Sequence, residues 1–134
     1  MNIRTGASAY ADVRVESDVM AASPYQLICL LFDGAGLAIR SALAHMQTGN
    51  VARKGEAISK ALDIVNNGLL ASLDLERGGE MGPKLAALYD YVARRLLAAN
   101  RDNDQEALLE AGRLLEDLGS AWRDIDPQAA HHPQ

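Results

Sequence analysis

The sequence predicts an all-α protein: an antiparallel up-down four-helix bundle over residues 23–125. An extended or mobile N-terminal segment (1–22) precedes it, and a disordered tail (126–134) follows. The chain has 134 residues, of which 49% are hydrophobic and 4% aromatic. Leu and Ala dominate, and both favour helix. Apolar residues recur at steps of three and four in four segments, as on one helical face. Short connections join these segments, as in antiparallel bundles.

The first two helices have recognisable start signals. Ser23 can cap free backbone N–H groups, and Pro24 fits the first helical position. This helix ends near Thr48, after which Asn50 is predicted to cap the second helix. The second helix is predicted to stop in the Gly-rich turn at residues 76–79. Their apolar stripes are Leu27, Leu31, Ala35, Ala38, Ala42 and Met46, and then Val51, Ile58, Leu62, Val65 and Leu69.

The third helix is predicted to begin near Pro83, and the fourth to end at Pro127. Asn103 with Glu106 three residues later has capping-box spacing. We therefore expect Asn103 to cap the fourth helix. The stripes are Leu85, Leu88, Tyr89, Val92, Leu96 and Ala99, and then Leu108, Ala111, Leu115, Leu118, Trp122 and Ile125.

Charge and composition exclude several classes of protein. The net charge of −5 argues against nucleic acid as a partner and against electrostatic binding to a membrane surface. We see no apolar run near the ~20 residues that span a bilayer. The N-terminus lacks the apolar core of a signal peptide. Because Cys29 has no cysteine partner, a reducing cytoplasmic location is the simplest interpretation.

The sequence shows no pattern that indicates catalysis or a bound cofactor. The stripes are apolar, and a Glu-x-x-His metal motif is missing. His45 is interpreted as a helix residue, and His131 and His132 as part of a solvated tail. Cys29 lacks a nearby base and is expected to be structural. We therefore predict a protein that is not an enzyme and has no metal or cofactor. A bundle enzyme would need a shielded polar cluster.

An ordered series of motifs resembles one known family. The motifs are A-S-P-x-x-L from Ala22, L-F-D-G from Leu31, K-A-L-D-I-V from Lys60, S-L-D-L-E-x-G-G-E from Ser72, L-Y-D-Y from Leu88, A-N at Ala99 and the late Trp122. Over about residues 10 to 125 the chain resembles the flagellin export chaperone family, FliS. The family commonly has Tyr at the position of Phe32.

The resemblance implies a cytosolic chaperone for flagellin. Such a protein holds the disordered C-terminal segment of flagellin and prevents premature polymerisation. It also supports delivery of the subunit to the membrane export gate of the flagellar type III secretion system. Ordering the segment costs conformational entropy, so the interface must be large.

Two of the predicted helices carry a second apolar strip. At ~100° per residue, Ile64 and Tyr91 each point away from the main stripe of their helix, among small alanines. Such a strip leaves a groove for the apolar face of a partner helix. The predicted flagellin groove comprises Ala57, Lys60, Ile64, Asn67, Ala71, Ala87, Tyr91, Arg95 and Ala98. The residues leave two alternatives open: a more fully buried third helix, or a homodimer or adaptor module that covers the strip.

The N-terminal segment is a candidate lid for this groove. Tyr10, Val13 and Val15 are apolar residues in an otherwise polar stretch. An empty apolar groove invites aggregation. We expect the segment to cover the groove and to leave when flagellin binds. The alternatives are that Tyr10 contacts flagellin directly, or that the segment touches nothing.

Overall fold

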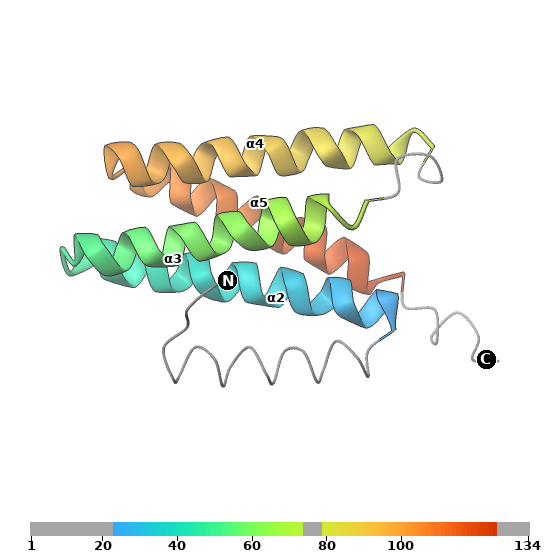
Figure 1. The fold of residues 1–134 in the computed structure, drawn as a ribbon, viewed down its shortest axis with the longest axis horizontal. Coiled ribbons are helices and arrows are strands. Elements are labelled where there is room, and N and C mark those ends of the chain that lie inside the picture. Colours follow the sequence, from blue (N-terminus) through green and yellow to red (C-terminus); the bar gives the residue numbers. More distant parts are fainter. Residues whose placement is uncertain (1–22, 74–78, 126–134) are drawn as a thin grey trace, which may run out of the picture.

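A computed structural model describes residues 23–73 and 79–125, and this part of the chain forms an all-α bundle (Figure 1). Its elements are α2 (Pro24–Gln47), α3 (Val51–Asp63), the π-helix η1 (Ile64–Leu70), α4 (Met81–Asp102) and α5 (Gln105–Arg123). Because η1 continues α3, the described residues form four helices in alternating directions. The predicted fold class is confirmed. The predicted N-terminal segment and tail lie outside the described residues.

The helices pack in a four-cornered arrangement. Helix α2 contacts α3 and α5, and α4 contacts α5 and the column formed by α3 and η1. The order around the bundle axis is therefore α2, α3 with η1, α4 and α5, so α2 and α4 stand diagonally opposite. Across this diagonal the rings of Phe32 and Tyr89 meet, with centroids 6.4 Å apart.

Two of the predicted helix caps are confirmed. The Ser23 hydroxyl accepts a hydrogen bond from the backbone N–H of Gln26, and the Gln26 side chain accepts one from the N–H of Ser23. This reciprocal pair is a capping box. At α3, the Asn50 side chain accepts from the N–H of Arg53 at 3.1 Å.

The predicted cap of the fourth helix is wrong by one residue. Asn103 has φ +52° and ends α4, whereas the Asp104 side chain caps α5 by accepting from the N–H of Ala107. Asn tolerates the left-handed conformation that commonly ends a helix. Asp is an equally good N-terminal cap. The sequence Asn-Asp therefore serves two helices, with one residue for each.

Two helix ends and the burial of one stripe residue also differ from the prediction. The second helix leaves the α form after Asp63 and ends at Leu70, before the Gly-rich turn. Helix α5 ends at Arg123, so Ile125 is not on its stripe and is 62% exposed. Val51, at the start of α3, is 69% exposed. Both side chains lie near bundle ends, where fewer neighbouring helices cover them.

Most of the core comes from the predicted stripes, although Leu88 of the third stripe is 37% exposed and the core also includes Phe32, Ile39, Ala61, Ala93 and Ala107. Its buried members are Phe32, Ala35, Ala38, Ile39, Ala42, Ile58, Ala61, Val65, Leu69, Tyr89, Val92, Ala93, Leu96, Ala99, Ala107, Leu108, Ala111 and Leu115. Trp122 is half-buried against this core and stacks on Tyr25 with ring centroids 5.8 Å apart. Its indole N–H donates to the backbone carbonyl of Tyr25 at 3.1 Å. Within the described ranges, the buried set includes one charged residue, Lys54.

Candidate interaction surfaces

Helix α2 is more apolar than its place in the bundle requires. Its most apolar stretch is long, and less than a third of that stretch is buried inside the bundle. By length and composition alone, this helix could cross a membrane, although a core helix of a soluble protein passes the same test. The expectation that no apolar segment is long enough to span a bilayer did not take this helix into account. Leu30 and Leu37 are 39% and 62% exposed. Helix α2 therefore carries apolar side chains outside the core.

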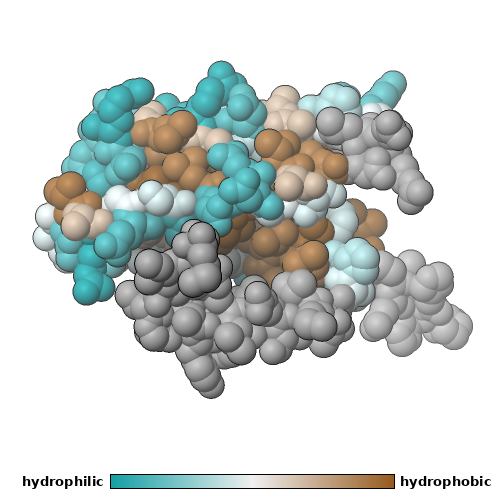
Figure 2. Space-filling model, viewed as in Figure 1, coloured by the Kyte–Doolittle hydropathy of each residue, from teal (hydrophilic) through white to brown (hydrophobic). Residues whose placement is uncertain are grey.

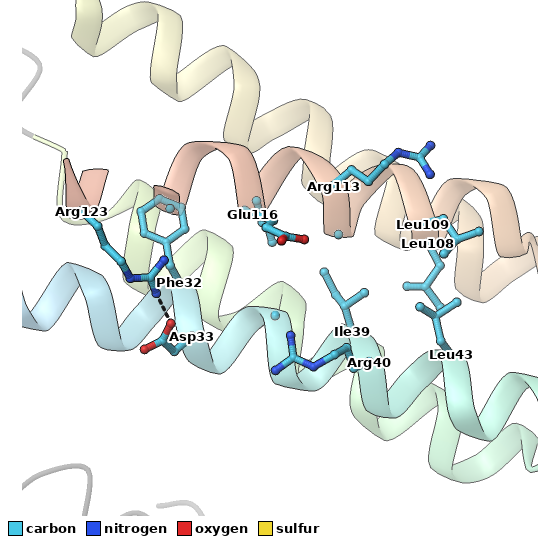
Figure 3. A pocket seen from close by; sticks show the side chains of 14 residues that line it. Phe32, Asp33, Ile39, Arg40, Leu43, Leu108, Leu109, Arg113, Glu116 and Arg123 are labelled. Atoms are coloured by element: carbon cyan, nitrogen blue, oxygen red, sulfur yellow. Dashed lines mark hydrogen bonds and ion pairs between the residues drawn. The ribbon is translucent and has the colours of Figure 1, made fainter. Parts of the chain in front are cut away.

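A groove of about 430 Å³ runs between α2 and α5 (Figure 3). Its apolar lining is Phe32, Ile39 and Leu43 from α2 and Leu108, Leu109 and Leu115 from α5, and charged side chains at Asp33, Arg40, Arg113, Glu116 and Arg123 also line it. Arg123 forms an ion pair with Asp33 at one end of the groove (Figure 3). Both side chains are largely exposed, so the pair stabilises the fold by at most about 1 kcal/mol.

Glycines set the close approach of α5 to α2. A Cβ atom at Gly119 would lie 3.2 Å from Cβ and Cγ of Phe32, and one at Gly112 would lie 3.3 Å from Cγ2 of Ile39. By contrast, a Cβ at Gly36 would meet the guanidinium of Arg40 at 3.4 Å and nothing closer. Two of these glycines let the helix backbones come together, and Gly36 leaves the groove open. The strips predicted from the sequence missed this groove, for which the glycines on α5 were the available signal.

The predicted strip on the second helix lies beside α2. Ile64 is half-buried, and its Cδ1 atom lies 3.3 Å from where a Cβ of Gly34 would be. The Asn67 side-chain amide donates to Asp63 at 2.7 Å. Of the remaining strip residues, Ala57 is half-buried, while Lys60 and Ala71 are exposed. Ile64 therefore packs in part between two helices of the bundle.

The predicted strip on the third helix lies beside α5. The Tyr91 hydroxyl donates to Oε1 of Glu110 at 2.9 Å, and Nε of Arg95 donates to the same oxygen at 2.6 Å. The hydrogen bond to Glu110 raises the pKa of Tyr91 above its usual value. Ala87 is exposed and Ala98 half-buried. The structure thus brings Tyr91 and Arg95 together in a polar cluster around Glu110.

The two predicted strips do not meet. One faces α2 from the column of α3 and η1, and the other faces α5 from α4, which are opposite edges of the bundle. Their role in binding stays a prediction. The lid residues Tyr10, Val13 and Val15 lie outside the described residues.

A second cavity, of about 460 Å³, lies at the bundle end where α2 and α4 begin. On the face drawn in Figure 2, apolar surface is prominent toward this end. In the described part of the chain, no group of three or more His, Cys, Asp or Glu side chains is placed to hold a metal ion.

Comparison with known proteins places the chain in a family. A family profile described as flagellar protein FliS matches residues 6–129. The chain is 51% identical over 130 residues to the flagellar secretion chaperone FliS of Salmonella typhimurium strain LT2, covering 97% of this chain and 96% of that protein. It is 45% identical to the protein of the same name from Escherichia coli strain K12, over 96% of both chains. With that of Bacillus subtilis strain 168 it shares 32% identity over 81% of this chain and 79% of the relative. The chain therefore belongs to the FliS family of flagellar secretion chaperones.

Proposed function

We propose that this protein is a cytoplasmic chaperone that binds the disordered C-terminal segment of flagellin. Binding prevents premature polymerisation and supports export of flagellin through the flagellar type III secretion system. The relatives are named as flagellar secretion chaperones, which supports a role in export. The observation that carries the proposal is the excess apolar surface of α2 beside the α2–α5 groove. The proposed mechanism requires no catalysis, cofactor or nucleic acid.

The groove suits an amphipathic helical segment. Its apolar floor can take the apolar face of a helix, and the charged side chains of Asp33, Arg40 and Glu116 can pair with polar groups along its edges. Binding to such a surface hides apolar side chains that flagellin would otherwise use for polymerisation. Because ordering a flexible segment costs about 2–5 kcal/mol or more, one groove of this size contributes only part of the interface.

We propose that the two predicted strips, around Ile64 and around Tyr91, also belong to the surface that binds flagellin. The strip around Ile64 continues the α2 surface on its other side, and the strip around Tyr91 lies across the bundle. A long segment that wraps the bundle would reach both. We also retain the proposals that residues 1–22 cover the apolar surface in the free protein and that the loaded chaperone meets the export gate at the membrane.

A homodimer or adaptor module is the second candidate function. The exposed Leu30 and Leu37 favour it, because a second copy of the chain could cover them. The measured mass of the free protein in solution distinguishes the two. A stable dimer that persists when flagellin is added would favour the second candidate.

The test is calorimetry with the C-terminal segment of flagellin from the same organism. We expect binding at micromolar concentration or tighter, with a negative heat-capacity change because apolar surface is buried. Gly36→Leu fills the groove and should weaken binding at least about ten-fold, since it blocks the floor that a partner helix needs.

Gly55→Leu is the matched control for this experiment. Gly55 is also a half-buried helical glycine, and a Cβ there would meet only Oδ1 of Asn100, at 3.8 Å, outside the groove. This variant should bind flagellin like the unmodified chain. Equal weakening by both variants would remove the groove from the proposal, and no binding by the unmodified chain would overturn the proposed function.

A further inference from the structure

The described residues give the cavity at the end of the bundle a neutral, mostly apolar wall. Its lining residues are Ile28, Phe32, Leu69, Ser72, Leu73, Met81, Gly82, Leu85, Tyr89, Leu118, Ala121, Trp122 and Ile125. No charged side chain of the described residues lines it. Its volume of about 460 Å³ lies in the range of small-molecule sites, roughly 300–1,000 Å³. Three aromatic residues, Phe32, Tyr89 and Trp122, are among the lining residues.

Tyr89 brings an unused hydrogen-bonding group to this cavity. The residue is 4% exposed, and its hydroxyl forms no hydrogen bond within residues 23–73 and 79–125. In that part of the chain, every fully buried side-chain oxygen or nitrogen has a hydrogen-bond partner. The Tyr89 hydroxyl therefore keeps some open contact, and the cavity that Tyr89 lines is where we place it. Burial raises the pKa of this phenol above its ordinary value, and a neutral phenol is a hydrogen-bond donor.

The other polar side chains that the described residues bring to the cavity wall are already engaged. The Trp122 indole N–H donates to the carbonyl of Tyr25, and the Ser72 hydroxyl donates to the carbonyl of Gly68 at 2.6 Å. Among the described lining residues, Tyr89 thus supplies the free donor of the wall. Because this hydroxyl keeps open contact, a ligand oxygen in the cavity could accept its hydrogen bond.

We infer that the end cavity binds a small, neutral, largely aromatic molecule that carries one oxygen, which accepts a hydrogen bond from Tyr89. Aromatic rings on the wall favour an aromatic ligand through edge-to-face and offset contacts. A charged ligand is excluded because the described wall offers no opposite charge to offset its desolvation. This site is independent of the proposed binding of flagellin and is tested without flagellin.

The probes are 4-ethylphenol, ethylbenzene and 4-ethylbenzoate, which share one ring and differ in polar group. Trp122 is the single tryptophan of the chain and lines the cavity, so its fluorescence reports occupancy at this place. Titration of the full chain should show 4-ethylphenol binding about three- to ten-fold more tightly than ethylbenzene, the effect of one hydrogen bond. The carboxylate should not bind.

Tyr89→Phe removes the hydroxyl and keeps the ring that packs on Phe32. In this variant, 4-ethylphenol and ethylbenzene should bind with equal affinity, while the affinity for ethylbenzene stays unchanged. Tyr91→Phe, two residues along α4, removes a hydroxyl bonded to Glu110 and should leave the preference intact. Absence of binding by both neutral probes, or a preference that survives Tyr89→Phe, would overturn the inference.

Discussion

The ammonium group of Lys54 donates a hydrogen bond to Oδ1 of Asn103 at 2.9 Å, which ties the start of α3 to the end of α4. Lys54 is 3% exposed, and it also donates to the backbone carbonyl of Asn100 at 3.3 Å. Carbonyls at a helix C-terminus carry the negative end of the helix dipole. The buried positive charge is therefore compensated by two oxygens and by the helix end.

Replacing Lys54 with Met should destabilise the bundle. The substitution keeps an unbranched apolar stem but removes both hydrogen bonds, so we expect the free energy of unfolding to fall by about 1.5–3 kcal/mol. Asn103→Gly keeps the positive φ and removes only one of the two acceptors. Its free energy of unfolding should therefore fall less than that of Lys54→Met. Urea denaturation followed by circular dichroism measures both. A Lys54→Met variant as stable as the unmodified chain would show that the ammonium contributes nothing.

The glycines of the α2–α5 groove should respond in opposite directions to alanine. Gly119→Ala places a Cβ 3.2 Å from Phe32, so the helices must separate slightly, and we expect a loss of about 1–3 kcal/mol. Gly36→Ala meets only the flexible end of Arg40 and should gain up to about 1 kcal/mol from helix propensity. Thermal unfolding of the two variants side by side is the measurement. A gain in both would mean that α5 is not held close by Gly119.

Periodicity predicted the fold because the forces that specify it are local and repetitive. Burial of one stripe fixes each helix, and short connections fix the antiparallel order. Caps were predictable where one candidate stood alone, as with Ser23 and Asn50. At Asn103 and Asp104 two adjacent residues can both cap, and propensity alone cannot divide the roles. The buried Lys54 was missed because its partners lie on α4, far away in sequence.

The interaction surfaces were harder to predict because they depend on contacts between helices. The strip around Ile64 was placed at ~100° per residue, whereas η1 is a π-helix with wider turns. Tyr91 was interpreted as an apolar contact, but its hydroxyl binds Glu110 from a neighbouring helix. A helical wheel of one segment contains neither fact. The groove between α2 and α5 arises from glycines and side chains of two helices together.

The hydrogen bond between Tyr91 and Glu110 should make stability depend on alkaline pH. The pKa of Tyr91 is raised in the folded protein, so the neutral phenol is favoured there. The stability that the Tyr91 hydroxyl contributes is fully present below the pKa of about 10 that tyrosine has in the unfolded chain. It is lost as pH rises through the higher pKa of Tyr91 in the folded protein. The stability difference between the unmodified chain and Tyr91→Phe should therefore shrink from pH ~8 to pH ~11. Urea denaturation at both pH values measures it. A difference that grows with pH would contradict the raised pKa.

Charge substitutions can identify which face binds flagellin. Leu37 is 62% exposed on α2, and Leu37→Glu should weaken flagellin binding by more than about 1 kcal/mol if that face is a central contact. Tyr91→Glu tests the edge between α4 and α5 in the same way. Val51→Glu is the control, because Val51 is 69% exposed at the start of α3, away from the groove. Calorimetry gives the affinities and circular dichroism checks the fold. If all three variants bind flagellin with the affinity of the unmodified chain, neither face is a central contact for flagellin.

Deletion of residues 1–18 tests the lid, whose residues Tyr10, Val13 and Val15 lie outside the described part of the chain. The reason to expect a lid is the exposed apolar surface of α2, whose contact with water is unfavourable. A segment that covers this surface competes with flagellin and lowers the apparent affinity by the fraction of time the surface is open. The truncated protein should therefore bind flagellin more tightly, or associate faster, and aggregate more readily when free.

Titration of the full-length and truncated proteins with one flagellin peptide, together with light scattering of the free proteins, decides between three outcomes. Tighter binding with more aggregation supports a lid, because the same contacts would protect the surface and exclude the partner. Weaker binding refutes it and indicates that Tyr10 contacts flagellin, since a contributing contact has been removed. Unchanged affinity and unchanged scattering mean that the segment covers no apolar surface. The exposed side chains of α2 then stay in contact with water until flagellin binds.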